Sequence, residues 1–260
     1  MHPAPRRPLL LGVAIAALAA FLGLGCTSED EPLTAEQATA ILEAGLLTRE
    51  DLPAAPWELT EGTAGDVSDA VGDEVPISMF AGTEACQDLE AAMDAFVGRE
   101  EASEQTPPLA EGERSFDAGN GSLVLRSVET SVVVPEDPTE VEQGFAGLRE
   151  IFNAERLRPC FEEAFMEGFG GDAEEVGVTE LALTEPDTLI EGGVGIALQM
   201  EAVAFIIPIA LHLEIHMWPE GPAVGSLMFM EMNSELLQEN SADILEAART
   251  RLASAVEANR

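Results

Sequence analysis

The sequence predicts an α+β fold in which helices flank an antiparallel sheet within a single domain. Two observations lead to this prediction. The second half of the chain contains four consecutive segments in which apolar and polar residues alternate, as they do in strands. Before and after these segments, apolar residues recur at helical spacing. Consecutive strands with short connections pair as an antiparallel meander, and amphipathic helices cover its faces.

The folded region begins with a helix predicted over residues 35–46. Thr34 and Gln37 form a capping-box pattern in front of apolar residues at helical spacing. A turn follows over residues 47–53. Short extended pieces are expected at 57–60 and 75–80.

A second helix is predicted over residues 84–97, with Cys86 on its apolar face. Residues 99–115 are polar and contain Pro107 and Pro108, so we interpret them as a surface loop. Residues 122–134 carry valines and leucines between polar residues and are expected to form a strand.

Two helices are predicted in the middle of the chain. The first covers residues 138–152, because Val141, Phe145, Leu148 and Phe152 form one apolar stripe. The second is expected to open at Pro159, which suits the first helical position because proline lacks an N–H.

The C-terminal half is predicted to be a four-stranded meander followed by a closing helix. Glu220-Gly221-Pro222 has the composition of a tight turn. Ser234 is expected to cap the closing amphipathic helix. The predicted strands cover residues 176–183, 194–205, 208–218 and 223–232.

The first 25 residues have the three parts of an export signal. Arg6 and Arg7 form a basic head, an apolar run follows, and small residues precede Cys26. The segment Leu22-Gly23-Leu24-Gly25-Cys26 resembles the lipobox of bacterial lipoproteins, which implies acylation of Cys26. The alternative is an ordinary secretory signal with an incidental cysteine. We therefore divide the chain into a signal (1–25), an acidic tether (26–33) and a folded domain (34–260), and expect an extracytoplasmic location with a lipid anchor in the cell membrane.

Three cysteines are present, Cys26, Cys86 and Cys160. If Cys26 carries lipid, the other two remain as one possible disulfide pair in an oxidising compartment. Two buried thiols or a metal pair are the alternatives. The absence of a CxxC motif and of a nearby histidine disfavours metal.

Charge excludes one class of partner. The chain has 49 acidic and 12 basic residues, all 12 of them arginine, and a formal net charge of −37. Nucleic acid binding requires a basic surface and is therefore not expected. We interpret the acidity as a solvated surface suited to a salty or acidic habitat in preference to a dedicated cation-binding role.

Candidate chemistry is sparse, and we expect neither catalysis, nor a cofactor, nor a metal site. No nucleophile elbow, phosphate-binding loop or dinucleotide motif is present. His212 and His216 could share a metal on a helix, but their segment alternates as a strand, where residues four apart lie about 13 Å apart. We assign His212, Glu214 and His216 to the polar face of that strand.

An apolar binding cleft between sheet and helices is a further possibility. Methionine and phenylalanine recur in the last strands and in the helix at 138–152, and methionine suits adaptable binding surfaces. A core filled with these side chains is the alternative. The residues that would line such a pocket are Phe145, Phe152, Met200, Phe205, Met228 and Met230.

Several short motifs resemble one known family. They are the segment Leu46–Pro53 (LLTREDLP), Ser131–Pro135 (SVVVP) and the cysteine in Leu157–Phe161 (LRPCF). This order resembles the actinobacterial sensor-domain lipoproteins, relatives of the extracellular sensor domain of PknH-type kinases. The resemblance implies an antiparallel sheet backed by helices, a disulfide, and a cleft for an unidentified ligand. That sensor domain has two disulfides, whereas this chain has cysteines for one.

The sequence thus predicts an exported, non-catalytic binding or sensor-type domain held at the cell envelope by an acyl anchor. A carrier of a lipid or other apolar ligand is the alternative function. The expected partners are the membrane, through the anchor, and a small apolar ligand or an envelope protein. A structural or adaptor role would instead require an exposed apolar patch.

Overall fold

The computed structural model describes residues 32–62, 108–119, 124–160, 176–204 and 206–260. Within these ranges one sheet has the strand order β1-β2-β3-β7-β6-β5-β4, and every neighbouring pair is antiparallel. The strands are β1 (Glu58–Gly62), β2 (Ala110–Gly119), β3 (Leu125–Val134), β4 (Val176–Thr184), β5 (Val194–Ala204), β6 (Ile207–Glu220) and β7 (Ala223–Met232). The helices with both ends described are α2 (Ala35–Gly45), the short 3₁₀ helix η1 (Arg49–Asp51), α5 (Thr139–Ile151) and α7 (Leu236–Asn259).

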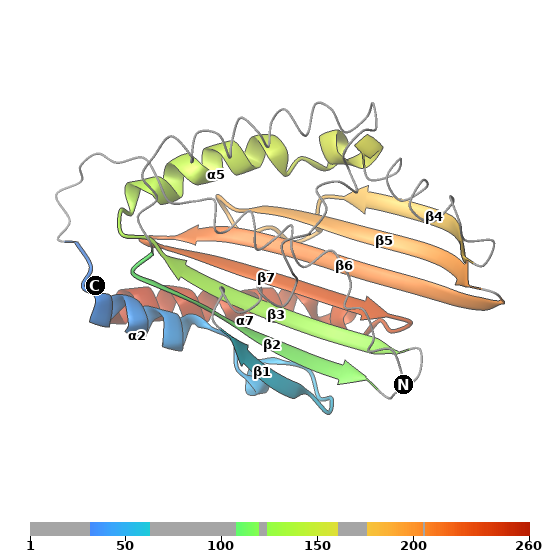
Figure 1. The fold of residues 1–260 in the computed structure, drawn as a ribbon, viewed down its shortest axis with the longest axis horizontal. Coiled ribbons are helices and arrows are strands. Elements are labelled where there is room, and N and C mark those ends of the chain that lie inside the picture. The colour runs from blue at the N-terminus through green and yellow to red at the C-terminus, as the bar shows by residue number, and fades with distance from the viewer. Residues whose placement is uncertain (1–31, 63–107, 120–123, 161–175, 205) are drawn as a thin grey trace, which may run out of the picture.

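The helices cover both faces of the sheet (Figure 1). α5 lies on one face, against β5 and β6, while α2 and α7 lie side by side on the other. Apolar residues alternate along the strands and so supply two cores. One core joins α5 to the sheet and contains Phe145, Leu213 and Ile215. The other joins α2 and α7 to the sheet and contains Trp218 and Phe229.

The predicted α+β class, with helices flanking an antiparallel sheet, is confirmed. Thr34 and Gln37 make both hydrogen bonds of a capping box at the start of α2. The apolar stripe of α5 is buried, and so are Leu237, Ile244, Leu245, Ala248 and Leu252 of α7. The four strands of the C-terminal meander lie within one or two residues of their predicted bounds. The pieces predicted at 75–80 and 84–97 lie outside the described residues.

The predicted surface loop at 99–115 is wrong for its last residues. Ala110–Gly119 forms β2, which pairs with β1 on one side and β3 on the other. The positions of β2 that face the α2 side include Gly112, Phe116 and Ala118, so the apolar alternation is too weak to reveal a strand. Backbone pairing on both edges makes this polar segment a strand, which is a tertiary effect.

The helix around Cys160 also begins earlier than predicted. It starts at Ala154, and the Asn153 side chain accepts hydrogen bonds from the backbone N–H groups of Glu155 and Arg156. Asn153 is therefore the N-cap. Pro159 is the sixth helical residue and not the first.

Gly225 lies under the Trp218 indole, and its lack of a side chain is required there. A Cβ atom at this position would be 2.5 Å from Trp218 Cζ2 and 2.9 Å from Leu252 Cδ2. We expect Gly225→Ala to lower the free energy of unfolding by about 1–3 kcal/mol, since both neighbours are fully buried. Urea denaturation measures this loss.

Gly112→Ala is the matched control, because there the Cβ would meet only the end of the Leu42 side chain, at 3.3 Å. Both substitutions restrict the unfolded chain equally, so their difference reports the clash. Equal stabilities for the two variants would contradict the prediction.

Candidate functional site

Three polar residues of β6 lie on the sheet face that α2 and α7 cover. His212, Glu214 and His216 alternate with Leu213 and Ile215, which point into the core under α5. The strand is as predicted, but its polar side chains are buried, at 6%, 8% and 2% exposed. Both imidazole rings also stack on Phe229 of β7, with ring centroids 6.2 and 5.9 Å away.

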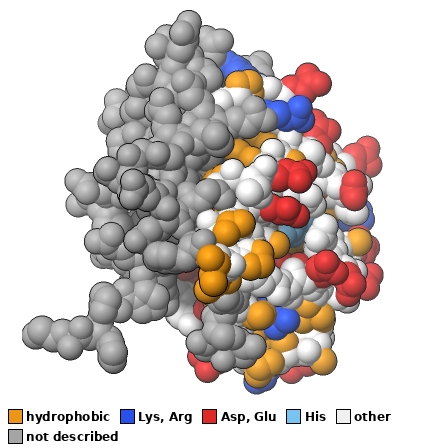
Figure 2. Space-filling view, turned by 90° about the vertical axis from the view of Figure 1, so that its right-hand side faces the viewer, with side chains coloured by type: hydrophobic (Ala, Val, Ile, Leu, Met, Phe, Trp, Pro, Cys, Tyr) orange, Lys and Arg blue, Asp and Glu red, His pale blue; other side chains and the backbone are white. Residues whose placement is uncertain are grey.

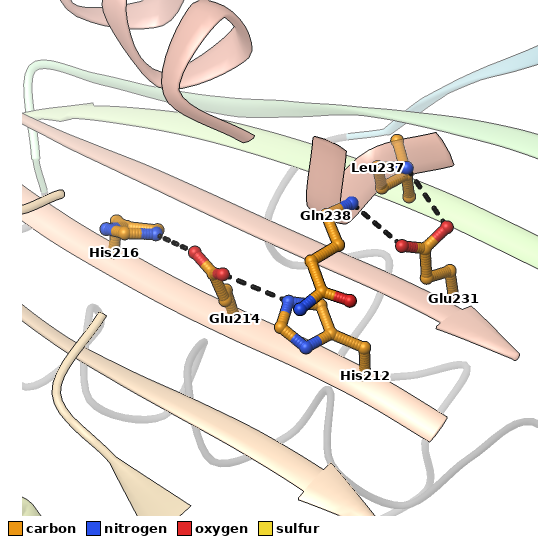
Figure 3. Close-up of polar contacts among 6 residues, drawn as sticks. All are labelled: His212, Glu214, His216, Glu231, Leu237 and Gln238. Atoms are coloured by element: carbon orange, nitrogen blue, oxygen red, sulfur yellow. Dashed lines mark hydrogen bonds and ion pairs between the residues drawn. The ribbon is translucent and has the colours of Figure 1, made fainter. Parts of the chain in front are cut away.

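Glu214 lies between the two histidines and binds both (Figure 3). His212 Nε2 is 3.0 Å from Glu214 Oε1, and His216 Nε2 is 2.9 Å from Oε2. Burial alone would raise the pKa of Glu214. The hydrogen bonds and charge attraction from His212 and His216 outweigh burial and lower this pKa to about 2. Glu214 is therefore a carboxylate at neutral pH, and both Nε2 atoms carry the hydrogen that they donate to it.

The other nitrogen of each ring is left without a hydrogen bond. Nδ1 of His212 and Nδ1 of His216 are buried and have no partner in the described part of the chain. A neutral imidazole that donates through Nε2 has an acceptor at Nδ1. In its neutral form each ring thus retains one unused acceptor.

Glu231 fixes the start of α7 above this row. It is fully buried on β7, directly across from His212. Its carboxylate accepts the backbone N–H groups of Leu237, at 3.0 Å, and Gln238, at 2.7 Å (Figure 3). These are N–H groups of the first helical turn, which have no acceptor within the helix.

The predicted cap of α7 is thereby corrected. Glu235 occupies the N-cap position, and its side chain makes no cap hydrogen bond. Ser234 accepts a hydrogen bond from Leu236 N at 3.3 Å, and Glu231 accepts the next two. A carboxylate from the neighbouring strand therefore satisfies the donors that we assigned to the serine.

A hollow of about 170 Å³ opens between the first turns of α7 and the β5–β6 part of the sheet. His212 and Glu214 belong to its wall, together with Gln238 and Ser241 of α7 and the segment 184–188, which begins with the last residue of β4. Figure 2 shows one end of the molecule, where acidic side chains lie on either side of a visible histidine. The residues that line the hollow are Thr184, Glu185, Pro186, Asp187, Thr188, Ala197, Gln199, His212, Glu214, Gln238 and Ser241.

This hollow is polar, unlike the apolar pocket proposed from the sequence. Sequence reasoning identified His212 and Glu214 as a polar face but missed Glu231, Gln238 and the segment 184–188. The signal for Glu231 was a single carboxylate in the otherwise apolar run Met228–Met232. No local pattern connects that residue or the segment 184–188 to β6.

The structure places most of the predicted apolar pocket in one cluster. Phe145, Phe152, Met200, Met228 and Met230 pack together between α5 and the sheet, each at most 9% exposed. Phe205 lies outside the described residues. Whether this cluster opens to hold a ligand stays a prediction.

Cys160 is fully buried and bonded in a disulfide. Cys86 and Cys26 lie outside the described residues, so their pairing and acylation remain predictions. No described helix has the length and apolar character needed to cross a membrane. In the described ranges, no three His, Cys, Asp or Glu side chains are grouped so that they could hold a metal ion.

Comparisons with known proteins give a distant structural resemblance. No family model and no curated protein matches this sequence. Among solved structures, the chain is similar to the extracellular domain of PknH from Mycobacterium tuberculosis, with a TM-score of 0.37 and 11% sequence identity. The match covers 85% of this chain and 98% of that one. At this distance no residue role or ligand is transferred to the present chain.

Proposed function

We propose that this protein is an exported, non-catalytic binding domain of the sensor type, anchored at the cell envelope through an acylated Cys26. The observation that carries the proposal is the polar hollow beside α7. Its wall contains a buried carboxylate, Glu214, and a buried imidazole, His212, whose Nδ1 has no described partner. A concave site with a few fixed polar groups is the usual form of a small-molecule binding site.

The location rests on the sequence. The signal-like first 25 residues and the lipobox-like segment before Cys26 support export and acylation. The disulfide at Cys160 supports an oxidising compartment, and Cys86 is the partner that we propose.

A carrier of an apolar ligand is the second candidate. The gathering of Phe145, Met200 and Met228 between α5 and the sheet supports it, because such a ligand would bind among these side chains. Their close packing favours a core, so the polar hollow is the better supported site.

Native mass spectrometry of the envelope-extracted protein tests the proposal. We expect an acyl mass on Cys26, the loss of two hydrogens at Cys86 and Cys160, and a small molecule that co-purifies. Ser241→Trp would fill the hollow from α7 and should remove the bound mass. Ser254→Trp, at an exposed position of the same helix, is the matched control and should retain it.

Two results would contradict the proposal. A protein without an acyl group would remove the anchor. A bound mass that survives in Ser241→Trp would place the ligand elsewhere, and its release by organic solvent would favour the apolar carrier.

A further inference from the structure

We propose that the hollow beside α7 selects a small primary amine, bound as its ammonium ion. This inference rests on the proposed function and names its ligand class. The net acidity of the chain does not carry it, because that charge attracts cations to the whole surface. The inference rests instead on the local arrangement of the residues that line the hollow.

The carboxyl groups that line the hollow come from three described residues, Glu185, Asp187 and Glu214. Glu185 and Asp187 come from the segment between β4 and β5, and Glu214 comes from β6. Among the described residues no arginine lines it, and the chain contains no lysine. A ligand carboxylate or phosphate would therefore meet like charges and no counter-charge, which disfavours anions.

Two of the lining residues, Glu214 and His212, retain unused hydrogen-bonding capacity. Each oxygen of Glu214 accepts from one histidine, and a carboxylate oxygen can accept twice. Nδ1 of His212 has no described partner and is a further acceptor when the ring is neutral. A primary ammonium carries one positive charge and three N–H donors, so it complements these groups.

The volume of the hollow and the chemistry of its lining residues narrow the class of ligand further. A cavity of roughly 150 Å³ can hold benzene, so a hollow of about 170 Å³ holds about six non-hydrogen atoms. Apart from the His212 imidazole, the described part of the wall has no aromatic ring, whereas quaternary ammonium ligands are usually held by aromatic faces. Hydroxyl and amide groups of Thr184, Thr188, Gln199 and Ser241 can bind a second polar end of the ligand.

The test compares four probes of similar length by calorimetric titration of the full mature protein in detergent at physiological salt. The probes are 1,4-diaminobutane, 4-amino-1-butanol, 1,4-butanediol and succinate, which exchange ammonium groups for neutral hydroxyls or carboxylates. We expect the dissociation constant to rise about tenfold when the first ammonium is replaced, a change of about 1.4 kcal/mol. The diol and succinate should show no measurable binding.

Variants then locate the site. Asp187→Asn changes an exposed loop residue, so it should fold normally and weaken diamine binding about tenfold. Glu214→Gln should weaken it further. Glu257→Gln, an exposed carboxylate near the far end of α7, is the matched control and should bind as the wild type does.

Several outcomes would overturn the inference. Equal binding of the diol or succinate would leave a ligand site that does not select cations, so the proposed function would stand. If Glu257→Gln weakens diamine binding as much as Asp187→Asn does, the diamine is attracted only to the acidic surface as a whole. Millimolar Ca²⁺ could displace the diamine equally well from the wild type and from Asp187→Asn. That result would point to a cation effect outside the hollow. If no probe binds, the inference fails, and the co-purified mass decides the proposed function separately.

Discussion

We expect Glu129→Gln to be more stable than the wild-type protein above pH 8 and equally stable below pH 4.5. Glu129 lies on β3, opposite Ser115 of β2, and is 7% exposed. Burial, followed by the negative charges of Glu113 and Asp117, raises the pKa of Glu129 from 4.5 to about 8. Glu113 and Asp117 are the residues two positions before and after Ser115, so they lie diagonal to Glu129.

The sign of the pH dependence follows from proton binding. Between pH 4.5 and 8 the folded protein holds a proton on Glu129 that the unfolded chain has released. The stabilisation from this group is therefore fully present below pH 4.5 and is lost as the pH rises to 8. At about 1.4 kcal/mol per unit of pKa difference, the loss amounts to several kcal/mol at most. Glutamine has the shape of the protonated acid and does not titrate.

Urea denaturation at a series of pH values between 4.5 and about 9 measures this effect. The wild type should lose stability across the interval, and Glu129→Gln should lose distinctly less. Glu201→Gln, which removes an exposed carboxyl from β5, serves as the control for the change in net charge. Parallel curves for wild type and Glu129→Gln would show that this carboxyl is ionised in the folded protein.

Glu214→Leu is expected to lower the free energy of unfolding by about 2–6 kcal/mol. The substitution leaves two buried Nε2 donors, of His212 and His216, without the carboxylate that accepts them. Each unsatisfied buried donor costs about 1–3 kcal/mol. Because leucine has a volume close to that of glutamate, packing contributes little to the loss.

Glu214→Gln separates the hydrogen bonds from the charge. Its amide oxygen still accepts from one histidine, and its NH₂ group can donate to the other ring in the alternative tautomer. We therefore expect a loss less than half that of the leucine variant, measured by urea denaturation at neutral pH. If Glu214→Leu and Glu214→Gln lower the free energy of unfolding equally, the contacts with His212 and His216 contribute nothing specific to stability.

The loss of stability at low pH offers an independent test of the interactions of Glu214. Its folded pKa of about 2 lies below the ordinary value of 4.5. Its stabilisation is therefore present above pH 4.5 and is lost as the pH falls toward 2. This part of the acid denaturation should be absent in Glu214→Gln.

Local sequence patterns were sufficient for most of the fold. Period-two alternation in β4 to β7 and helical spacing in α2, α5 and α7 are local properties of the chain, and a core on each face follows from them. β2 was missed because its α2-facing positions include glycine and alanine, so pairing with β1 and β3 determines its conformation. The start of the helix at Ala154 depends on the Asn153 side chain, and the proline was the more conspicuous but incorrect signal.

The sequence by itself determined most of the secondary structure, the alternation of His212, Glu214 and His216 with apolar neighbours, and the acidity of the chain. Tertiary structure alone decided that this polar row is buried, because α7 crosses it and Glu231 of β7 fixes the first turn of that helix. It also decided that the segment 184–188 and Glu214 line the same hollow and that Glu113 and Asp117 flank Glu129. Burial and charge proximity depend on which segments meet in space, and a linear pattern of residue types does not contain that information.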